Sequence, residues 1–210
     1  MGIPVLILGE SGTGKSCSMR NLDPQGVVLF NVASKPLPFR ARFPYAVNQA
    51  GYSRILASLK KGTAKRYVID DSQYLMAFEE FDHANETGYG KFTTMALNFY
   101  NVVKYVIEST PPDCIVYFLH HTEMTDAGRV KAKTVGKMID SKLTLEGLFS
   151  IVLRCHTDGS RHWFSTQSDG CDTCKSPMDM FPAEIDNDLR LVDDTIREYY
   201  EFDKEEIEND

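Results

Sequence analysis

The chain has 210 residues, of which 42 % are hydrophobic and 25 % charged, proportions that are ordinary for a globular domain with a sizeable core. No stretch approaches 18 uninterrupted apolar residues, and the chain begins directly with a short apolar run. We therefore expect neither a membrane span nor a secretion signal. Five cysteines, an odd number, favour reduced thiols and a cytoplasmic location.

The net charge of −7 is unevenly distributed. Residues 198–210 hold seven acids and one lysine, which leaves residues 1–197 with a net charge of only −1. We interpret 1–197 as a single domain and 198–210 as an acidic C-terminal tail. Such a tail is typical of a solvated chain end, and it could also compete with DNA phosphates for a basic face. The acidic overall charge therefore does not exclude a nucleic-acid partner.

The first part of the chain predicts two strands around a glycine-rich loop. Residues 3–8 form a β-branched apolar run typical of a buried strand, and a glycine-rich loop follows at 9–16. A helix should begin at about Lys15. A second strand is expected at 27–32. Residues 34–40 hold two prolines, which exclude a regular helix or a central strand.

The middle of the chain predicts helices around a third strand. Residues 53–61 show helical spacing and are followed by a glycine, whereas 67–71 indicate a buried strand that closes on two carboxylates. Residues 76–92 are polar and mixed, with an exposed loop expected at 88–91. A long helix is expected at 93–109, where two prolines stop it.

The last part predicts further strands and one more helix. A fourth strand at 114–119 ends in His-His-Thr-Glu, and a polar, basic segment follows at 124–142. Strands at 149–154 and 162–166 are expected to form a hairpin. A short final helix is expected at 187–199.

Strands that alternate with helices indicate an α/β fold, with a mainly parallel sheet flanked by helices on both faces. Ligands of such sheets bind outside the carboxyl ends of the strands. The glycine-rich loop, Asp70 with Asp71, and His120 with His121 all follow such ends. The sequence therefore predicts one site at one edge of the sheet.

The strongest motif is the glycine-rich loop, which matches the phosphate-binding pattern G-x-x-x-x-G-K-[ST] at every position. Its residues are Gly9, Glu10, Ser11, Gly12, Thr13, Gly14, Lys15 and Ser16. The glycines allow backbone N–H groups to surround a phosphate, and the helix that follows would point its positive dipole end at the same anion. Lys15 should reach the β- and γ-phosphates of ATP, and the Ser16 hydroxyl should bind Mg²⁺. Cys17 is also expected to contact the nucleotide.

Two carboxylates follow the third predicted strand. Asp70 is expected to hold Mg²⁺, directly or through water, so that the metal bridges the β- and γ-phosphates. An aspartate that only forms a turn is the competing interpretation. Asp71 stands where many ATPases place the carboxylate that activates water, and a role in capping the following turn is equally well supported.

Two further candidates concern the γ-phosphate. Neighbouring strand side chains face opposite ways, so only one of His120 and His121 can face the nucleotide, and we favour His121, with Thr122 as an alternative. A core histidine bonded to backbone competes with this role. Lys175 is a candidate charge-stabilising finger on the γ-phosphate, within the chain or across a subunit interface. A plain surface lysine is the simpler interpretation.

The basic segment contributes Arg129, Lys131, Lys133 and Lys137, and its glycines indicate a mobile loop. Such a loop could grip a polyanion such as single-stranded DNA, with salt-sensitive affinity. A solvated surface loop is equally well supported.

Cys171 and Cys174 have the spacing of metal ligands, and Cys155, His156 and His162 lie upstream. A single C-x-x-C without a second matched pair is poor evidence for zinc, so we do not expect a zinc site here.

With these residues assembled, the chain resembles the phage-encoded RecA-like P-loop ATPases that consist of the ATPase core alone. Those proteins are associated with single-strand annealing and homologous recombination. The matching segments are Gly9–Ser16, the strand end at 68–70, the strand end at 120–123, and 175–177 before the helix at Asn187. The similarity runs over most of residues 3–200.

The resemblance implies a RecA-like fold, ATP and Mg²⁺ as cofactors, single-stranded DNA as partner, and homo-oligomers or filaments in the host-cell cytoplasm. A single-strand-binding protein could be a further partner. One departure concerns hydrolysis, because RecA-like enzymes carry a water-activating Glu just beyond the second strand, where this chain has Ala33-Ser34-Lys35. Unless Asp71 or Glu123 substitutes, hydrolysis should be slow.

The leading hypothesis is a Mg²⁺-dependent ATPase that acts with single-stranded DNA in recombination or annealing. The alternative is an ATP-binding switch or accessory protein of a phage assembly, with little hydrolysis. A small-molecule or nucleoside kinase is less well supported, because Arg154 and Arg161 do not form a lid-like arginine cluster. A GTPase is disfavoured by the lack of an N-K-x-D motif.

Overall fold

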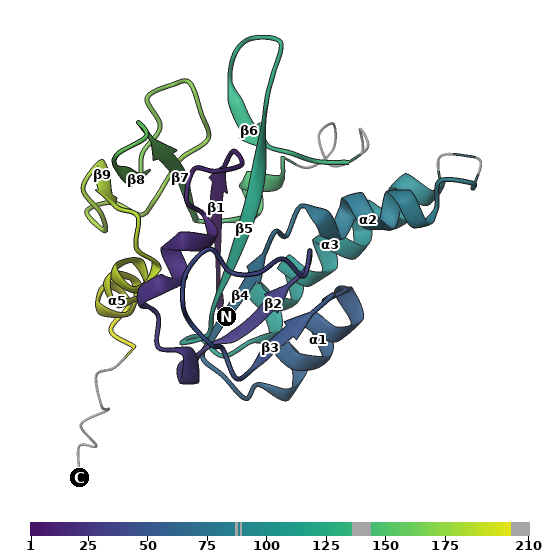
Figure 1. Cartoon of the computed structure of the whole chain (residues 1–210), viewed down its shortest axis with the longest axis horizontal. Coiled ribbons are helices and arrows are strands. Elements are labelled where there is room, and N and C mark those ends of the chain that lie inside the picture. Colours follow the sequence, from purple (N-terminus) through teal and green to yellow (C-terminus); the bar gives the residue numbers. More distant parts are fainter. Residues whose placement is uncertain (87, 89, 136–143, 203–210) are drawn as a thin grey trace.

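The computed structural model describes residues 1–86, 88, 90–135 and 144–202. The chain forms a mixed, mostly parallel sheet with helices on both faces, which confirms the predicted α/β class (Figure 1). The strand order is β3-β2-β4-β5-β1-β7-β8-β9, and β6 pairs with β5 outside this path. Lys137, predicted as a DNA contact, and residues 203–210 of the predicted tail at 198–210 lie outside the described residues.

The strands from β3 to β7 in this order run parallel. They are β1 (Ile3–Gly9), β2 (Val28–Asn31), β3 (Ala46–Asn48), β4 (Arg66–Asp70), β5 (Ile115–Met124) and β7 (Ile151–Thr157). β1 lies between β5 and β7, and the register places Gly9 beside His121 and Leu8 beside Arg154. β1 and β2 are buried throughout, as expected for strands covered on both faces.

The remaining strands are antiparallel to their neighbours. β8 (His162–Ser165) forms the predicted hairpin with β7, and the short β9 (Glu184–Asp186) pairs with β8. β6 (Val130–Ala132) pairs with the end of β5, which explains why β5 continues past its predicted end. The short outer strands β3 and β9 were not predicted.

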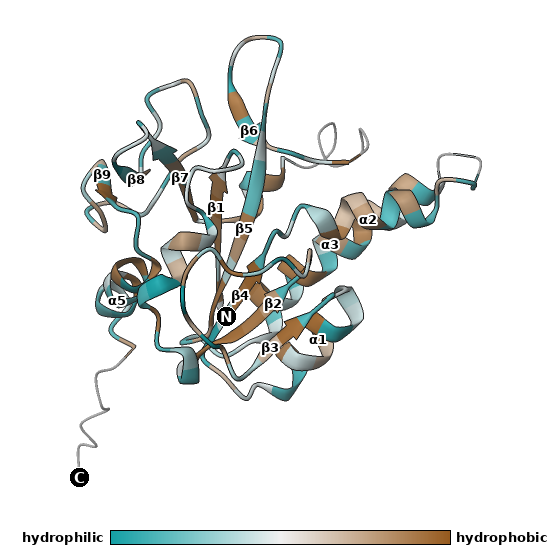
Figure 2. Cartoon of the chain, viewed as in Figure 1, coloured by the Kyte–Doolittle hydropathy of each residue, from teal (hydrophilic) through white to brown (hydrophobic). Residues whose placement is uncertain are grey.

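Helices divide between the two faces of the sheet (Figure 1). They are α1 (Tyr52–Lys61), α2 (Tyr74–Asp82), α3 (Gly90–Ser109), α5 (Leu189–Tyr199) and the 3₁₀ helices η1 (Ser16–Asn21), η2 (Pro24–Gly26) and η3 (Leu145–Leu148). α1, α2 and α3 pack on the face that includes Leu6 and Phe118, whereas η1 and α5 pack on the face that includes Ile7 and Tyr117. Figure 2 shows the central strands as the most hydrophobic part of the fold.

Two predicted helical features differ from the structure. The helix after the glycine-rich loop is a six-residue 3₁₀ helix that ends at Asn21, and Pro24 begins a second 3₁₀ helix. The segment at 76–92, for which the sequence predicted only a loop at 88–91, contains most of α2, whose Leu75 and Met76 are buried in the core. Among the described residues, no helix is long and apolar enough to cross a membrane.

Candidate functional site

A cavity of about 340 Å³ lies at the carboxyl ends of β1 and β4, at the sheet edge that the sequence predicts. Its volume falls within the range of small-molecule sites. The lining residues come from the glycine-rich loop and the start of η1, from the segments around the ends of β2 and β4, and from β5. They are Ser11, Gly12, Gly14, Lys15, Ser16, Cys17, Lys35, Pro36, Pro38, Asp70, Asp71 and His121.

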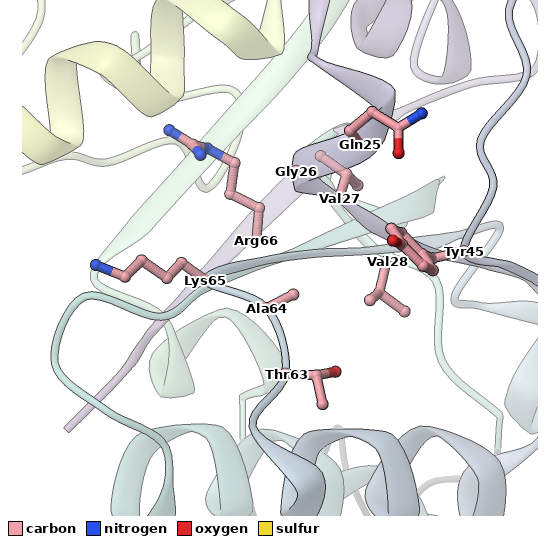
Figure 3. A pocket seen from close by; sticks show the side chains of 9 residues that line it. All are labelled: Gln25, Gly26, Val27, Val28, Tyr45, Thr63, Ala64, Lys65 and Arg66. Carbon is pink, nitrogen blue, oxygen red and sulfur yellow. The ribbon is translucent and has the colours of Figure 1, made fainter.

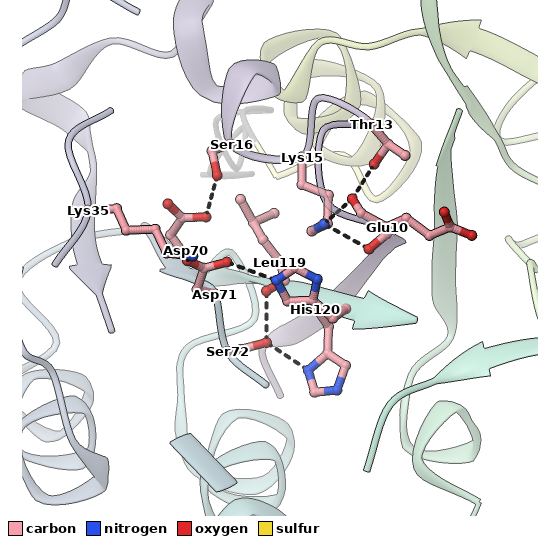
Figure 4. A network of polar contacts seen from close by, with 12 residues as sticks. Glu10, Thr13, Lys15, Ser16, Lys35, Asp70, Asp71, Ser72, Leu119 and His120 are labelled. Carbon is pink, nitrogen blue, oxygen red and sulfur yellow. Dashed lines mark hydrogen bonds and ion pairs between the residues drawn. The ribbon is translucent and has the colours of Figure 1, made fainter. Parts of the chain in front are cut away.

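The glycine-rich loop has the backbone conformation that its sequence requires. Gly12 and Gly14 have φ angles of 83° and 102°, in the left-handed region that glycine adopts without strain. Lys15 is buried inside the loop, and its Nζ donates hydrogen bonds of 2.7 Å to the carbonyl oxygens of Gly9 and Glu10 (Figure 4). Burial lowers the pKa of Lys15 below its usual value. The loop thus holds a cation where a phosphate would need one.

The two predicted metal ligands lie side by side. The Ser16 hydroxyl donates to Asp70 Oδ1 at 2.8 Å, although 54 residues separate them (Figure 4). Burial raises the pKa of Asp70 to about 6, despite the hydrogen bond from Ser16. A hydroxyl and a carboxylate are oxygen donors of the kind that Mg²⁺ prefers. Within the described residues no group of three or more His, Cys, Asp or Glu side chains could hold a metal, so an ion here would take its other ligands from phosphate and water.

Asp71 is held by two partners at the same edge. Its Oδ2 accepts from Lys35 Nζ at 2.8 Å, and its Oδ1 lies 3.2 Å from His121 Nε2. Burial alone would raise the pKa of Asp71, but the bonds from His121 and Lys35 bring it to about 2. The Tyr74 ring contacts both partners, with Lys35 Nζ 4.7 Å from its centroid. Asp71 also has a φ of 58°, an uncommon conformation that clusters at functional sites.

The two adjacent histidines have different surroundings. His121 lines the cavity, whereas His120 is fully buried. His120 Nε2 donates to the carbonyl oxygen of Lys133 at 2.8 Å, and its Nδ1 lies 2.9 Å from the Ser72 hydroxyl, which donates to the carbonyl oxygen of Leu119 at 3.0 Å. Burial lowers the pKa of His120 to about 4. His120 is therefore a neutral core residue that supports the strand end.

The β7–β8 hairpin packs behind the glycine-rich loop. The carbonyl oxygen of Thr13 accepts from His162 Nδ1 at 2.8 Å and from Cys155 Sγ at 2.9 Å. Asn187 Nδ2 in turn donates to Cys155 Sγ at 2.8 Å. A Cβ at Gly14 would lie 2.9 Å from His162 Nδ1, so glycine is needed there for space as well as for conformation.

Sequence reasoning did not identify these contacts of His162, Cys155 and Asn187, because more than 140 residues separate the hairpin from the loop. It also missed the bond from Lys35 to Asp71. For Lys35 a signal was present, since the residue directly follows the second strand, where the resemblance implies a residue of the site.

Two candidate catalytic residues do not line the cavity. Glu123 lies near the end of β5, where Lys131 Nζ pairs with its carboxylate at 3.0 Å. The backbone of Lys175 pairs with that of Val152, which lies beside Leu6 in the middle of the sheet. The cavity therefore forms without either side chain.

The predicted basic loop is in part a β-hairpin made by β5 and β6. Arg129 donates from Nε and Nη2 to the carbonyl oxygen of Asp172, at 3.1 and 2.9 Å. Lys131 pairs with Glu123, and Lys133 is exposed just beyond β6. Arg129 and Lys131 therefore bond to other parts of the fold, whereas Lys133 is exposed to solvent.

The cysteine and histidine candidates for zinc are dispersed. Cys171 is exposed and Cys174 is buried, and both are free thiols. Cys155 and His162 contact the glycine-rich loop, whereas His156 stacks on Trp163 with ring centroids 5.3 Å apart.

A second cavity, of about 410 Å³, lies at the opposite, amino ends of β2 and β4 (Figure 3). Its cations already have acidic partners, because Arg66 pairs with Asp193 and Lys65 with Asp113. A scan against protein-family models found no match for this chain, and a search of curated proteins found none. The motif and the geometry of the first cavity are therefore the features that bear on function.

Proposed function

We propose that this chain is a RecA-like P-loop ATPase that binds ATP and Mg²⁺ at Gly9–Ser16 and acts with single-stranded DNA in recombination or annealing. One observation carries the nucleotide part of the proposal. The hydroxyl of Ser16 and the carboxylate of Asp70 meet 2.8 Å apart at the mouth of a complete phosphate-binding loop. A glycine-rich turn that matched the motif only by chance would not be expected to bring these two side chains into contact.

The residues present fit an ATP–Mg²⁺ complex. Lys15 Nζ now bonds to two loop carbonyls, and it can exchange these for the oxygens of the β- and γ-phosphates. Ser16 and Asp70 would hold the metal, which offsets charge on those oxygens when it is bound. The short η1 helix and the loop N–H groups would face the same anion.

A second candidate, an ATP-binding switch with little hydrolysis, is favoured by the surroundings of Asp71. One of its oxygens accepts from Lys35 and the other bonds to His121, and these bonds lower the pKa of Asp71 to about 2, which makes it a weak base toward water. Lys35 also occupies the region where the resemblance implies a water-activating Glu. We therefore expect slow turnover in the free protein, with faster turnover only if a partner rearranges this pair.

The DNA part of the proposal depends on the resemblance and on the basic hairpin. The experiment that tests both parts measures ATP binding and phosphate release, with and without single-stranded DNA. Lys15→Ala should abolish binding, and Asp71→Asn should leave binding within a few-fold while it changes turnover. Wild-type ATP affinity equal to that of Lys15→Ala would overturn the nucleotide proposal. Turnover that DNA does not change, together with no salt-sensitive DNA binding, would overturn the DNA part.

A further inference from the structure

A third and larger cavity, of about 750 Å³, lies next to the first cavity, which is lined by the glycine-rich loop and is called the phosphate cavity from here on. It forms where β2 and β3 end, and its walls include Tyr52 at the start of α1 and several side chains of α2. Tyr74 connects the two cavities, because it lines the larger one and also contacts Lys35 and His121 of the smaller one. Neither the motif nor the proposed function assigns a ligand to this larger cavity.

Aromatic and acidic side chains line much of this cavity. Tyr52, Tyr74 and Phe78 line it, with the rings of Tyr74 and Phe78 5.2 Å apart and Phe78 43 % exposed. Glu79 and Asp82 supply two negative charges, and the described residues that line the cavity include no Lys, Arg or His. Carboxylates beside aromatic faces favour organic cations over anions.

Two polar atoms in the cavity walls lack partners. Among the described residues, neither the Tyr52 hydroxyl nor Glu79 Oε2 has a hydrogen-bond partner, although both atoms are buried. The other oxygen of Glu79 accepts from Asn98 Nδ2 at 2.6 Å, which fixes the orientation of the carboxylate. Burial and the nearby charge of Glu79 raise the pKa of Tyr52, so the hydroxyl stays neutral. Buried polar atoms in native proteins normally have partners. Glu79 Oε2 can only accept a hydrogen bond, whereas the Tyr52 hydroxyl can either donate one or accept one from a bound group.

We propose that this cavity binds a small organic cation, an amine or a guanidinium. Its N–H groups would donate to Glu79 Oε2 and to the Tyr52 hydroxyl, and its charge would rest against Phe78 and Tyr74. The fold already places one cation on the Tyr74 ring, since Lys35 Nζ lies 4.7 Å from its centroid. The proposal does not depend on nucleotide binding.

The test is a calorimetric titration of the full chain with agmatine, which carries both an amine and a guanidinium, in the absence of nucleotide. We expect saturable binding, and none of the neutral analogue n-butylurea. Glu79→Gln keeps the acceptor for Asn98 but removes the charge, and it should weaken agmatine binding at least tenfold. Glu108→Gln makes the same charge change on the exposed side of α3, where Glu108 pairs with Lys104, and it should bind as wild type does.

Two further variants distinguish an effect on agmatine binding from a loss of stability and from a loss of ATP binding. Tyr52→Phe removes a buried, unpartnered hydroxyl, so it should fold at least as stably as wild type while it binds agmatine several-fold more weakly. Lys15→Ala should bind agmatine normally, even if ATP binding is lost. Absence of saturable agmatine binding, wild-type affinity in Glu79→Gln, or binding of adenosine or cytidine in place of agmatine would each overturn the proposal.

Discussion

The imidazole Nδ1 of His162 donates a hydrogen bond of 2.8 Å to the carbonyl oxygen of Thr13, across 149 residues of sequence. Cys155 Sγ approaches the same oxygen at 2.9 Å. A trans peptide points its C=O and the following N–H in opposite directions, so a Thr13 carbonyl held against β7 and β8 turns the N–H of Gly14 away from them. Gly14 lines the phosphate cavity, so in the proposed ATP complex His162 would position an N–H group for the phosphate without touching it.

His162→Ala should weaken ATP binding about fivefold, because it removes one hydrogen bond of roughly 1 kcal/mol from the loop. His162→Asn should restore most of the affinity, since its amide nitrogen can take the place of Nδ1. Titration with a fluorescent ATP analogue measures both. Arg161→Ala, which changes the neighbouring exposed side chain, should bind as wild type does. Equal affinities in His162→Ala and wild type would contradict the positioning role.

Ser16 and Asp70 should act as a unit in Mg²⁺-dependent binding. Asp70→Asn should lower ATP affinity by about a hundredfold when Mg²⁺ is present, and by little when the metal is chelated, because the carboxylate would act through the ion. The double variant with Ser16→Ala should lose less than the sum of the single free-energy losses, since both side chains hold the same ion. Binding assays with Mg²⁺ and with EDTA make the comparison. Additive losses would indicate separate roles.

The glycine-rich loop and Asp70 could be located from sequence because each follows a buried apolar run, and parallel strands bring their carboxyl ends to one edge. The same logic placed His121 near the cavity. The contacts of His162 and Cys155 with Thr13 could not be predicted, because they depend on how an antiparallel hairpin packs against the loop. The pattern of residues within each segment does not specify that packing.

Secondary structure was missed where tertiary packing outweighs local pattern. α2 has only a short buried face, at Leu75 and Met76, so its periodicity is weak. β3 and β9 have three residues each and gain their hydrogen bonds from a neighbouring strand. A helix was predicted to begin at about Lys15, and the structure has the short 3₁₀ helix η1 there, a geometry that the sequence did not specify.

His120 should make stability depend on pH below neutrality. Its folded-state pKa of about 4 lies below the ordinary value of 6.5, so the unfolded chain binds more protons than the folded chain between these values. Stability should therefore fall as pH falls from 6.5 to 4, by about 3 kcal/mol from this residue. Urea unfolding at several pH values should show a shallower loss in His120→Gln. Parallel curves for the two proteins would contradict the assignment.

The hairpin cations should separate into DNA contacts and structural contacts. Lys133 is exposed, so Lys133→Ala should weaken single-stranded DNA binding and reduce the slope of log affinity against log salt by about one. Arg129 is bound to the carbonyl oxygen of Asp172, so Arg129→Ala should lower thermal stability as well. Fluorescence anisotropy across a salt series, combined with melting curves, distinguishes the two. An unchanged salt slope in Lys133→Ala would remove it from the DNA interface.

Asp193 on α5 should be the acid that matters most for stability. It is 1 % exposed, and it accepts from Arg66 Nε at 2.6 Å, Arg197 Nε at 2.8 Å and the Tyr117 hydroxyl at 3.0 Å. Asp193→Asn leaves the guanidinium of Arg197, itself 4 % exposed, without a charged partner, and should cost about 3–5 kcal/mol of unfolding free energy.

The matched control for Asp193→Asn is Asp113→Asn, which breaks the pair between Asp113 and a Lys65 side chain that is 62 % exposed. Water solvates that lysine when its partner is lost, so the cost should stay below about 1 kcal/mol. Urea unfolding at pH 7 compares the two variants. ATP affinity should change in neither, because Arg66 and Lys65 lie at the amino end of β4 and the phosphate cavity lies at its carboxyl end. Equal costs would mean that burial does not govern the strength of these pairs.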